Sequence, residues 1–219
     1  HYAARCYMAR APDSGTSGES FDTRTVVGGS QGLSSQAIER ATASGDVREY
    51  TPHPGQWEFH NRPERFRVLA CGARWGKDIA TIEETIKWVK FLLEHRKDNI
   101  DLQPLIHVWT VSPNYPLSRQ FWRDLKVRFP QALGPDPDNS KYVLRAAGGK
   151  ILWEIKSADN PDSLMAVGID ILNVVEAGMI PDAAWEMSLR PRLMTPGRLG
   201  IGIINGTPKG RGSWYETAF

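Results

Sequence analysis

The residues best suited to chemistry lie in the turn Ala70–Asp78, which reads Ala-Cys-Gly-Ala-Arg-Trp-Gly-Lys-Asp. It stands between an apolar run and a segment with helical periodicity, as a phosphate-binding loop does. In such a loop the backbone N–H groups bind an anion, and a lysine, here Lys77, adds positive charge. The pattern G-x-x-x-x-G-K-[ST] is not met, because Cys71 replaces the first glycine and Asp78 the hydroxyl residue. Taken alone, the turn is equally compatible with a turn glycine followed by a solvated lysine.

After Tyr50 the sequence alternates between segments with the periodicity of strands and segments with the periodicity of helices, and these elements must position the turn. We expect strands over residues 66–71, 105–111, 169–175 and 199–204, helices over residues 79–93 and 118–129, and a hairpin from residues 142–145 and 151–155. Alternating strands and helices of this length predict an α/β fold with a mostly parallel sheet and helices on both faces. Ligands of such sheets bind beyond the carboxyl ends of the strands, where this turn would lie.

The composition is that of an ordinary globular chain. At 219 residues, 41% hydrophobic and 24% charged, the chain fits one large domain, or one domain with an extension. No run approaches the roughly 18 apolar residues of a membrane span, so an integral membrane protein is excluded. Cys6 and Cys71 are too few and too far apart to predict a disulfide scaffold or a zinc site. The formal net charge of +2 gives no strong signature for nucleic acid, so a DNA role must be argued from motifs.

The first 49 residues differ in composition from the rest. They are rich in Gly and Ser, which is typical of an extension or linker, with a short helix expected over residues 34–42. We therefore place a single domain at residues 50–219. Because the chain begins with His1 and stops at Phe219 inside an expected helix, we interpret it as a piece of a longer polypeptide without a signal peptide.

Five further segments carry residues suited to nucleotide chemistry. In chain order they are Pro54-Gly55-Gln56, Val111–Tyr115, Ser157–Ala166, Val175-Glu176-Ala177 and Thr207-Pro208-Lys209-Gly210. Each is a weak signal. Gln56, for example, suits a residue that reads the adenine edge, but taken alone it is better explained as an ordinary surface glutamine. Together with the Ala70–Asp78 turn, the ordered set resembles the ATPase domain of the large terminase subunit of tailed bacteriophages. The resemblance runs from about Thr51 to Phe219.

This resemblance implies a fold, ligands and partners. The fold would be that of a P-loop NTPase of the RecA/ASCE-like type, using ATP and Mg²⁺. The partners would be double-stranded DNA, the portal protein, the small terminase subunit and further copies of the chain in a ring, commonly of five. Such a protein works in the host cytoplasm and transiently at the portal vertex of the procapsid. The family's C-terminal nuclease domain is absent from this sequence.

The resemblance also assigns roles residue by residue. Glu176 would be the catalytic residue that orients or deprotonates the attacking water. Thr207 and Lys209 would couple hydrolysis to movement on DNA. The ATP-binding residues would be Gln56, Gly72, Arg74, Trp75, Gly76, Lys77 and Asp78, with Asp78 also the metal ligand.

Four departures from the family pattern fall on important positions. Asp78 replaces the loop hydroxyl, Val175 the first acid of an acidic pair, Met165 an arginine finger, and Ala166 the glycine after it. An arginine finger is worth roughly 10³ to 10⁵ in rate, and valine cannot hold Mg²⁺ or its waters. Asp78 is either a compensating metal ligand or a like charge that repels phosphates, by about 4 kcal/mol at 4 Å and an effective dielectric constant of 20. We favour the second interpretation, which predicts a slow or inactive ATPase. The alternative is a non-hydrolysing docking or nucleotide-binding module.

The aromatic residues have two interpretations. Trp88, Trp109, Trp153 and Trp185 fall at core-facing positions, so we expect them to pack in the interior. The segment 209–215 joins a basic run to Trp214 and Tyr215 and either faces a DNA backbone or forms an ordinary solvated loop.

Overall fold

A seven-stranded sheet organises the domain. The computed structural model describes residues 50–96, 103–165, 167–208 and 213–218; the expected helix over 34–42, Ala166 and Lys209 lie outside these ranges. The sheet order is β1-β7-β6-β2-β5-β4-β3. The strands are β1 (Phe66–Ala70), β2 (Ile106–Ser112), β3 (Asp136–Asp138), β4 (Val143–Ala146), β5 (Ile151–Ser157), β6 (Ile171–Val174) and β7 (Ile201–Gly206).

The pairing of these strands confirms the expected mostly parallel sheet. The five strands β1, β7, β6, β2 and β5 run parallel. The predicted hairpin is present as antiparallel β4 and β5, and β3 extends it at the sheet edge. The carboxyl ends of the parallel strands therefore meet at one edge of the sheet, and the turn after β1 lies there.

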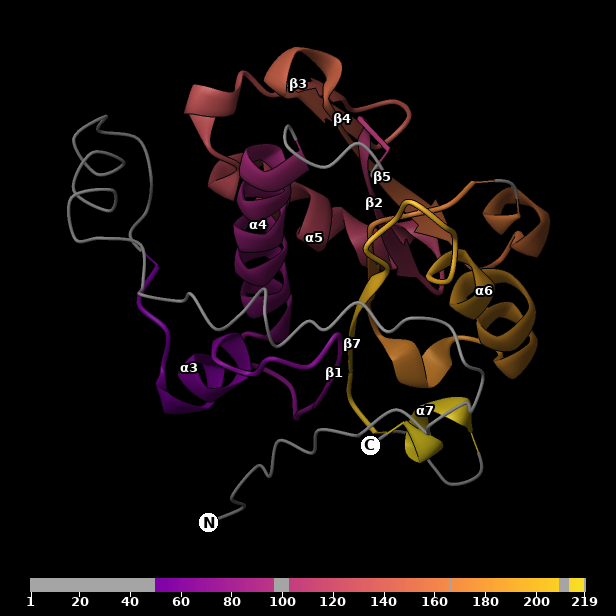
Figure 1. The fold of residues 1–219 in the computed structure, drawn as a ribbon. Helices are drawn as coiled ribbons and strands as arrows, with labels where there is room; N and C mark the ends of the chain where they lie inside the picture. The colour runs from indigo at the N-terminus through magenta and orange to yellow at the C-terminus, as the bar shows by residue number, and fades with distance from the viewer. Residues whose placement is uncertain (1–49, 97–102, 166, 209–212, 219) are drawn as a thin grey trace.

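Helices cover both faces of the sheet. Helices α4 (Lys77–His95) and α5 (Tyr115–Arg128) lie on one side, and α6 (Arg190–Arg192) and α7 (Trp214–Thr217) lie on the other (Figure 1). A π-helical segment over Ala184–Leu189 leads into α6, and the short helix α3 (Pro54–His60) precedes β1. None of the helices in the described ranges combines the length and apolar character needed to cross a bilayer.

Successive residues of each strand point to opposite faces of the sheet and pack into two apolar clusters, one on each face. In β2, Val108 faces the cluster under α4 and α5, whereas Trp109 faces the cluster under α6 and α7. The predicted core positions of the tryptophans are confirmed. Trp109, Trp153 and Trp185 are buried, and Trp88 is partly buried against the core.

The expectation that Trp214 and Tyr215 face solvent or a DNA backbone is wrong. Both are buried, and the Trp214 ring stacks on Trp185 with ring centroids 4.3 Å apart. The Tyr215 hydroxyl donates to the main-chain oxygens of Leu69 and Gly206 at 3.2 and 2.9 Å. Burying two large rings removes much apolar surface from water, so Trp214 and Tyr215 of α7 belong to the core.

The amino end of β6 carries a buried charge cluster at the sheet edge opposite the phosphate turn. The Asp170 carboxylate is fully buried and pairs with Arg96 and Arg198. It also accepts a hydrogen bond from the backbone N–H of His107 at 2.8 Å. Asp170 therefore ties the amino ends of β2 and β6 to the end of α4, far from the ligand edge.

Candidate phosphate-binding site

The loop between β1 and α4 is sharply folded. Arg74 and Gly76 both adopt the left-handed region, with φ of 64° and 81°. A Cβ atom at Gly76 would lie 2.8 Å from the Gln56 side-chain nitrogen, so position 76 excludes a side chain on both conformational and steric grounds. A left-handed arginine is a strained conformation of the kind that concentrates at ligand sites.

The backbone of this loop presents unused donors. Among the described residues, no protein group accepts a hydrogen bond from the backbone N–H groups of Gly72 through Lys77. These donors precede the N-terminus of α4, a 19-residue helix whose dipole favours negative charge at that end. The residues present therefore fit a phosphate group.

Helix α3 holds the loop from outside. His53 caps α3, and its Nδ1 accepts from the backbone N–H groups of Gly55 and Gln56 at 3.2 and 3.4 Å. With Nδ1 as acceptor, the Nε2–H of His53 donates to the Trp75 carbonyl at 3.1 Å. The His53 and Trp75 rings also meet edge to face, 4.7 Å between centroids. His53 therefore fastens the loop to α3 through one imidazole.

Gln56 makes a second fastening to the loop. Its side-chain nitrogen donates to the Gly76 carbonyl at 3.3 Å, and its side-chain oxygen accepts from the His53 backbone N–H at 3.1 Å. Both ends of the Gln56 amide are thus engaged by the protein, and its assignment as an adenine reader stays a prediction. The sequence reasoning missed His53 and α3.

Lys77 and Glu176 come together from opposite sides of β7. Lys77 is the first residue of α4 and is buried, and its Nζ lies 3.4 Å from the Glu176 carboxylate. Glu176 follows β6 in the left-handed region, with φ of 53°. Gly206 ends β7 between them, and a Cβ atom there would lie 2.9 Å from the Ala177 backbone nitrogen. A glycine at position 206 is therefore what lets the Glu176 turn approach the sheet.

Asp78 lies beside this pair in a poorly solvated position. Burial raises the pKa of its carboxyl group; the Lys77 ammonium opposes this rise, and the Glu176 carboxylate adds to it. The Asn205 side chain donates to Asp78 at 3.2 Å and to the Thr81 hydroxyl at 2.9 Å. The side-chain oxygen of Asn205 is buried and has no partner among the described residues.

The other predicted site residues are placed as follows. Arg74 is exposed, and Thr207 is half-buried directly after β7, at the same sheet edge. Val175 is buried and belongs to the apolar cluster under α4 and α5. Met165 is 42% exposed, on the loop before β6. Lys209 lies outside the described residues.

The donor set suits a magnesium–nucleotide pair more than a metal held by protein alone. Within the described ranges no group of three or more His, Cys, Asp or Glu side chains could hold a metal ion. Mg²⁺ is ordinarily bound through one or two carboxylates together with substrate phosphates. Asp78 and Glu176 are the carboxylates that act on one another beside Lys77, so a metal bound there would depend on phosphate oxygens for further ligands.

Sequence comparison finds similarity to curated large terminase subunits. The relative from Thermus phage G20c is 27% identical over 177 residues, covering 76% of this chain and 36% of the relative. The relative from Thermus virus P23-45 is 26% identical over the same length, with the same coverage. The chain thus spans about a third of the length of these relatives. No protein-family model matches the chain. The similarity confirms the predicted resemblance to large terminase subunits.

Structural comparison confirms the predicted fold class. The large terminase ATPase domain of Thermus phage P74-26 superposes with a TM-score of 0.61 at 24% identity, covering 77% of this chain and 69% of that one. The large terminase of a second thermophilic bacteriophage, in complex with ADP, gives a TM-score of 0.51 at 14% identity, covering 69% and 36%. The fold is therefore that of terminase ATPase domains of the P-loop NTPase type.

Proposed function

We propose that residues 50–219 are the ATPase domain of a DNA-packaging terminase with impaired hydrolysis. The observation that carries the proposal is the 3.4 Å approach of Lys77 to Glu176 beside a loop whose backbone N–H groups have no acceptor among the described residues. It joins a phosphate-binding cation, a row of amide donors and a proton acceptor at the ligand edge of one sheet. The similarity to large terminase subunits supports the same assignment.

In this proposal the loop residues bind ATP. The amides of Gly72 through Gly76 and the Lys77 ammonium would contact the β- and γ-phosphates, with the exposed Arg74 guanidinium adding charge. Trp75 would brace the loop through its contact with His53. Gln56 would read the adenine edge after releasing the Gly76 carbonyl. Mg²⁺, when bound through phosphate oxygens, would neutralise charge on the phosphates, and Asp78 would join its ligands only in the compensating-ligand interpretation.

Hydrolysis needs a proton acceptor, and Glu176 is the residue we assign to it. Its carboxylate would orient or deprotonate the attacking water. Thr207, after the strand that separates β1 from β6, would sense the change at the phosphates and with Lys209 pass it to movement on double-stranded DNA. The portal protein, the small terminase subunit, a five-membered ring and work in the host cytoplasm at the portal vertex belong to this same proposal.

Three substitutions are the reason to propose impaired hydrolysis. Val175 is an apolar residue of the core where the family places an acid, so its side chain provides no ligand for Mg²⁺. Met165 is an exposed thioether where the family places an arginine. Asp78 brings a carboxyl group rather than a hydroxyl to the phosphates, and its raised pKa means that its surroundings disfavour another negative charge.

Steady-state hydrolysis of magnesium ATP, with and without DNA, tests this proposal. We expect the natural chain to turn over well below about 1 s⁻¹, the lower end of the range typical of kinases. Adding Asp78→Thr, Val175→Asp and Met165→Arg together should raise the rate, and a matched triple with Met187→Arg in place of Met165→Arg should not. Met187 is a suitable control because it is also an exposed methionine and lies elsewhere, in the π-helical segment Ala184–Leu189. Turnover at or above about 1 s⁻¹ by the natural chain would contradict impaired hydrolysis.

The alternative is a docking or nucleotide-binding module that never hydrolyses ATP. The buried Val175 favours it, because one substitution cannot rebuild an acidic pair there without burying a charge. A thermal-shift titration separates the forms of this alternative. A ligand at a hundred times its Kd stabilises by about 2.7 kcal/mol, so ATP should raise the Tm of a nucleotide binder and leave a pure docking scaffold unchanged.

A further inference from the structure

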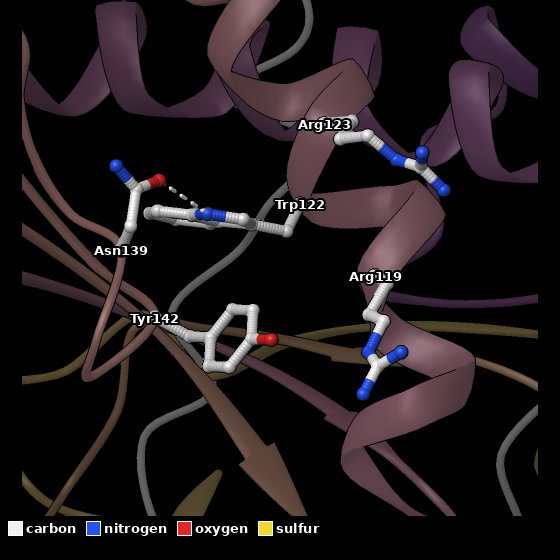
Figure 2. A pocket seen from close by; sticks show the side chains of 5 residues that line it. All are labelled: Arg119, Trp122, Arg123, Asn139 and Tyr142. Atoms are coloured by element: carbon white, nitrogen blue, oxygen red, sulfur yellow. Dashed lines mark hydrogen bonds between the residues drawn. The ribbon is translucent and has the colours of Figure 1, made fainter.

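A concave site lies on α5 and is lined by none of the residues of the phosphate loop. Figure 2 shows it as a cleft with Arg119, Trp122 and Arg123 on α5 and Asn139 and Tyr142 on the segment facing them. Its volume is about 400 Å³. This is within the range of pockets that hold small organic groups.

The two arginines of this cleft are available to a ligand. Both are exposed, and four residues apart they lie on one face of the helix. Within the described residues neither pairs with a carboxylate, although Arg128 of the same helix pairs with Glu83 at 2.8 Å. The nearest acid on α5, Asp124, accepts a hydrogen bond from the Gln120 side chain at 2.9 Å.

The acid on the opposite wall is also engaged. Asp138 accepts from the Ser140 backbone N–H, the Ser140 hydroxyl and the Lys141 backbone N–H, at 3.0, 2.6 and 3.1 Å. These hydrogen bonds lower the pKa of the half-buried Asp138 and hold its carboxylate against its own turn. The cleft therefore presents positive charge without a matching internal anion.

Aromatic rings line the same cleft. Tyr142 stacks on Tyr115 with centroids 5.7 Å apart and meets Trp122 edge to face at 5.8 Å. The Trp122 indole N–H donates to the Asn139 side chain at 3.0 Å, and Lys126 donates to the same oxygen at 2.7 Å. Trp122 is thus fixed as a wall, whereas Tyr115 keeps 43% of its surface exposed.

Tyr142 is held in an unusual backbone conformation. Its φ is 53°, in the left-handed region that a bulky aromatic residue rarely adopts. Such strain persists only where surrounding contacts impose it, and it is found preferentially at binding sites. Here it orients the Tyr142 ring between Tyr115 and Trp122.

We propose that this cleft binds a segment of single-stranded nucleic acid. Arg119 and Arg123 would contact successive phosphates, and an unpaired base would pack against the Tyr142 and Tyr115 rings. Guanidinium groups beside open aromatic rings are the combination that single strands require, because each base offers a π face and each linkage a negative charge. A duplex keeps its bases stacked inside and would use only the arginines.

This inference goes beyond the proposed function, because it stands on α5 and the facing segment alone. It would hold if the phosphate loop bound no nucleotide. The two are distinguished by Lys77→Ala, which should abolish ATP binding and leave strand binding unchanged.

Fluorescence anisotropy of a labelled oligothymidylate with the full chain tests the inference. Removing both charges with Arg119→Ala and Arg123→Ala should weaken binding at least tenfold. It should also reduce the slope of log K against log salt by about 1.4, since each single-strand phosphate contact contributes about 0.7. Tyr142→Asn should weaken the single strand about fivefold or more while leaving a duplex of equal length unaffected. Asparagine tolerates the left-handed backbone at position 142, and a thermal melt checks folding.

The matched control is Arg62→Ala with Arg190→Ala. These arginines also lie on or beside helices, each pairs with a glutamate four residues before it, and removing them changes the net charge equally. Retained binding by this control supports the inference. Equal weakening by the control would overturn the inference and indicate binding through net charge alone. The inference would also be overturned if the arginine variant weakened single strand and duplex alike while Tyr142→Asn had no effect, because the cleft would then bind only the phosphate backbone.

Discussion

Helix α4 carries two carboxyl groups in opposite electrostatic surroundings: Asp78 is half-buried and Glu84 is fully buried. Asp78, in its first turn, receives one amide hydrogen bond from Asn205, and burial raises its pKa. Burial works the same way on Glu84, further along the helix, but hydrogen bonding by His60 and the charges of Arg67 and Lys87 outweigh it and lower its pKa. The Glu84 carboxylate lies 2.7 Å from His60 Nδ1 and 2.5 Å from the Arg67 guanidinium.

The difference distinguishes, on one helix, a charge that stabilises the fold from a charge that is available to a ligand. Glu84 is matched by fixed cations, so its ionisation is built into the fold. Asp78 shares its surroundings with a lysine, a second carboxylate and a buried amide oxygen that has no partner among the described residues. An added anion or proton would therefore change the charge balance around Asp78 more than around Glu84, and ligand binding belongs at the Asp78 end.

The largest expected effect on stability comes from removing the charge of Glu84. Glu84→Gln removes the charge that compensates Arg67, whose side chain is 1% exposed. We expect a loss of about 3–5 kcal/mol in the free energy of unfolding, the usual cost of leaving a buried charge without its partner. Urea denaturation measures it. The control Glu58→Gln breaks an exposed pair with Arg62 and should cost less than about 1 kcal/mol. A loss of stability as small as that of the control would contradict the contrast drawn between Glu84 and Asp78.

A third carboxylate extends the comparison to the other face of the sheet. Burial raises the pKa of Glu154, but hydrogen bonds from His107, Lys156 and Trp109 outweigh it and hold the pKa at about 2. A depressed carboxyl pKa stabilises the fold above the unfolded value of 4.5, and this stability is lost as the pH falls from 4.5 through about 2. The loss should be roughly 2–3 kcal/mol.

Unfolding free energies measured across that pH window check the prediction. Glu154→Gln should flatten the acid limb of the curve there, and Glu186→Gln, which breaks an exposed helical pair, should not. An acid limb equally steep in Glu154→Gln and the natural chain would show that the hydrogen bonds to Glu154 do not control this loss.

The smallest and most informative of these effects concerns Asp78. A carboxyl group with a raised pKa loses its charge first as the pH falls, so nucleotide affinity should rise as the pH is lowered through that pKa. Asp78→Asn should bind ATP about tenfold more tightly at neutral pH and lose this pH dependence. Fluorescent-nucleotide titration over a pH series measures both. Weaker binding of magnesium ATP by Asp78→Asn would instead identify Asp78 as a compensating metal ligand.

Much of the scaffold could be predicted from the sequence, because it rests on local periodicity. The apolar run ending at Ala70 and the helical pattern after Lys77 are strong signals over contiguous residues. Helix α3 was missed because it has only seven residues and its cap is His53 rather than Ser, Thr, Asp or Asn. The edge strand β3 was missed because its sequence is Asp-Pro-Asp, which lacks strand formers.

The contacts that decide the chemistry could not be predicted, because they join distant parts of the chain. The bond from Gln56 to the Gly76 carbonyl spans 20 positions, and that from Asn205 to Asp78 spans 127. Burial of Trp214 against Trp185 likewise depends on where α7 packs. Motif order predicted which residues would gather at the sheet edge, and the structure brings Lys77, Asp78 and Glu176 together there.

The central claim is that the turn between β1 and α4 holds the phosphates of a nucleotide, with Lys77 as their main cation. Isothermal titration calorimetry with a non-hydrolysable ATP analogue and Mg²⁺ tests it most directly, comparing the natural chain with Lys77→Ala and with Lys90→Ala further along the same helix. We predict saturable binding by the natural chain and by Lys90→Ala, and at least tenfold weaker binding by Lys77→Ala. No binding by the natural chain, or equal affinity in the two lysine variants, would contradict the claim.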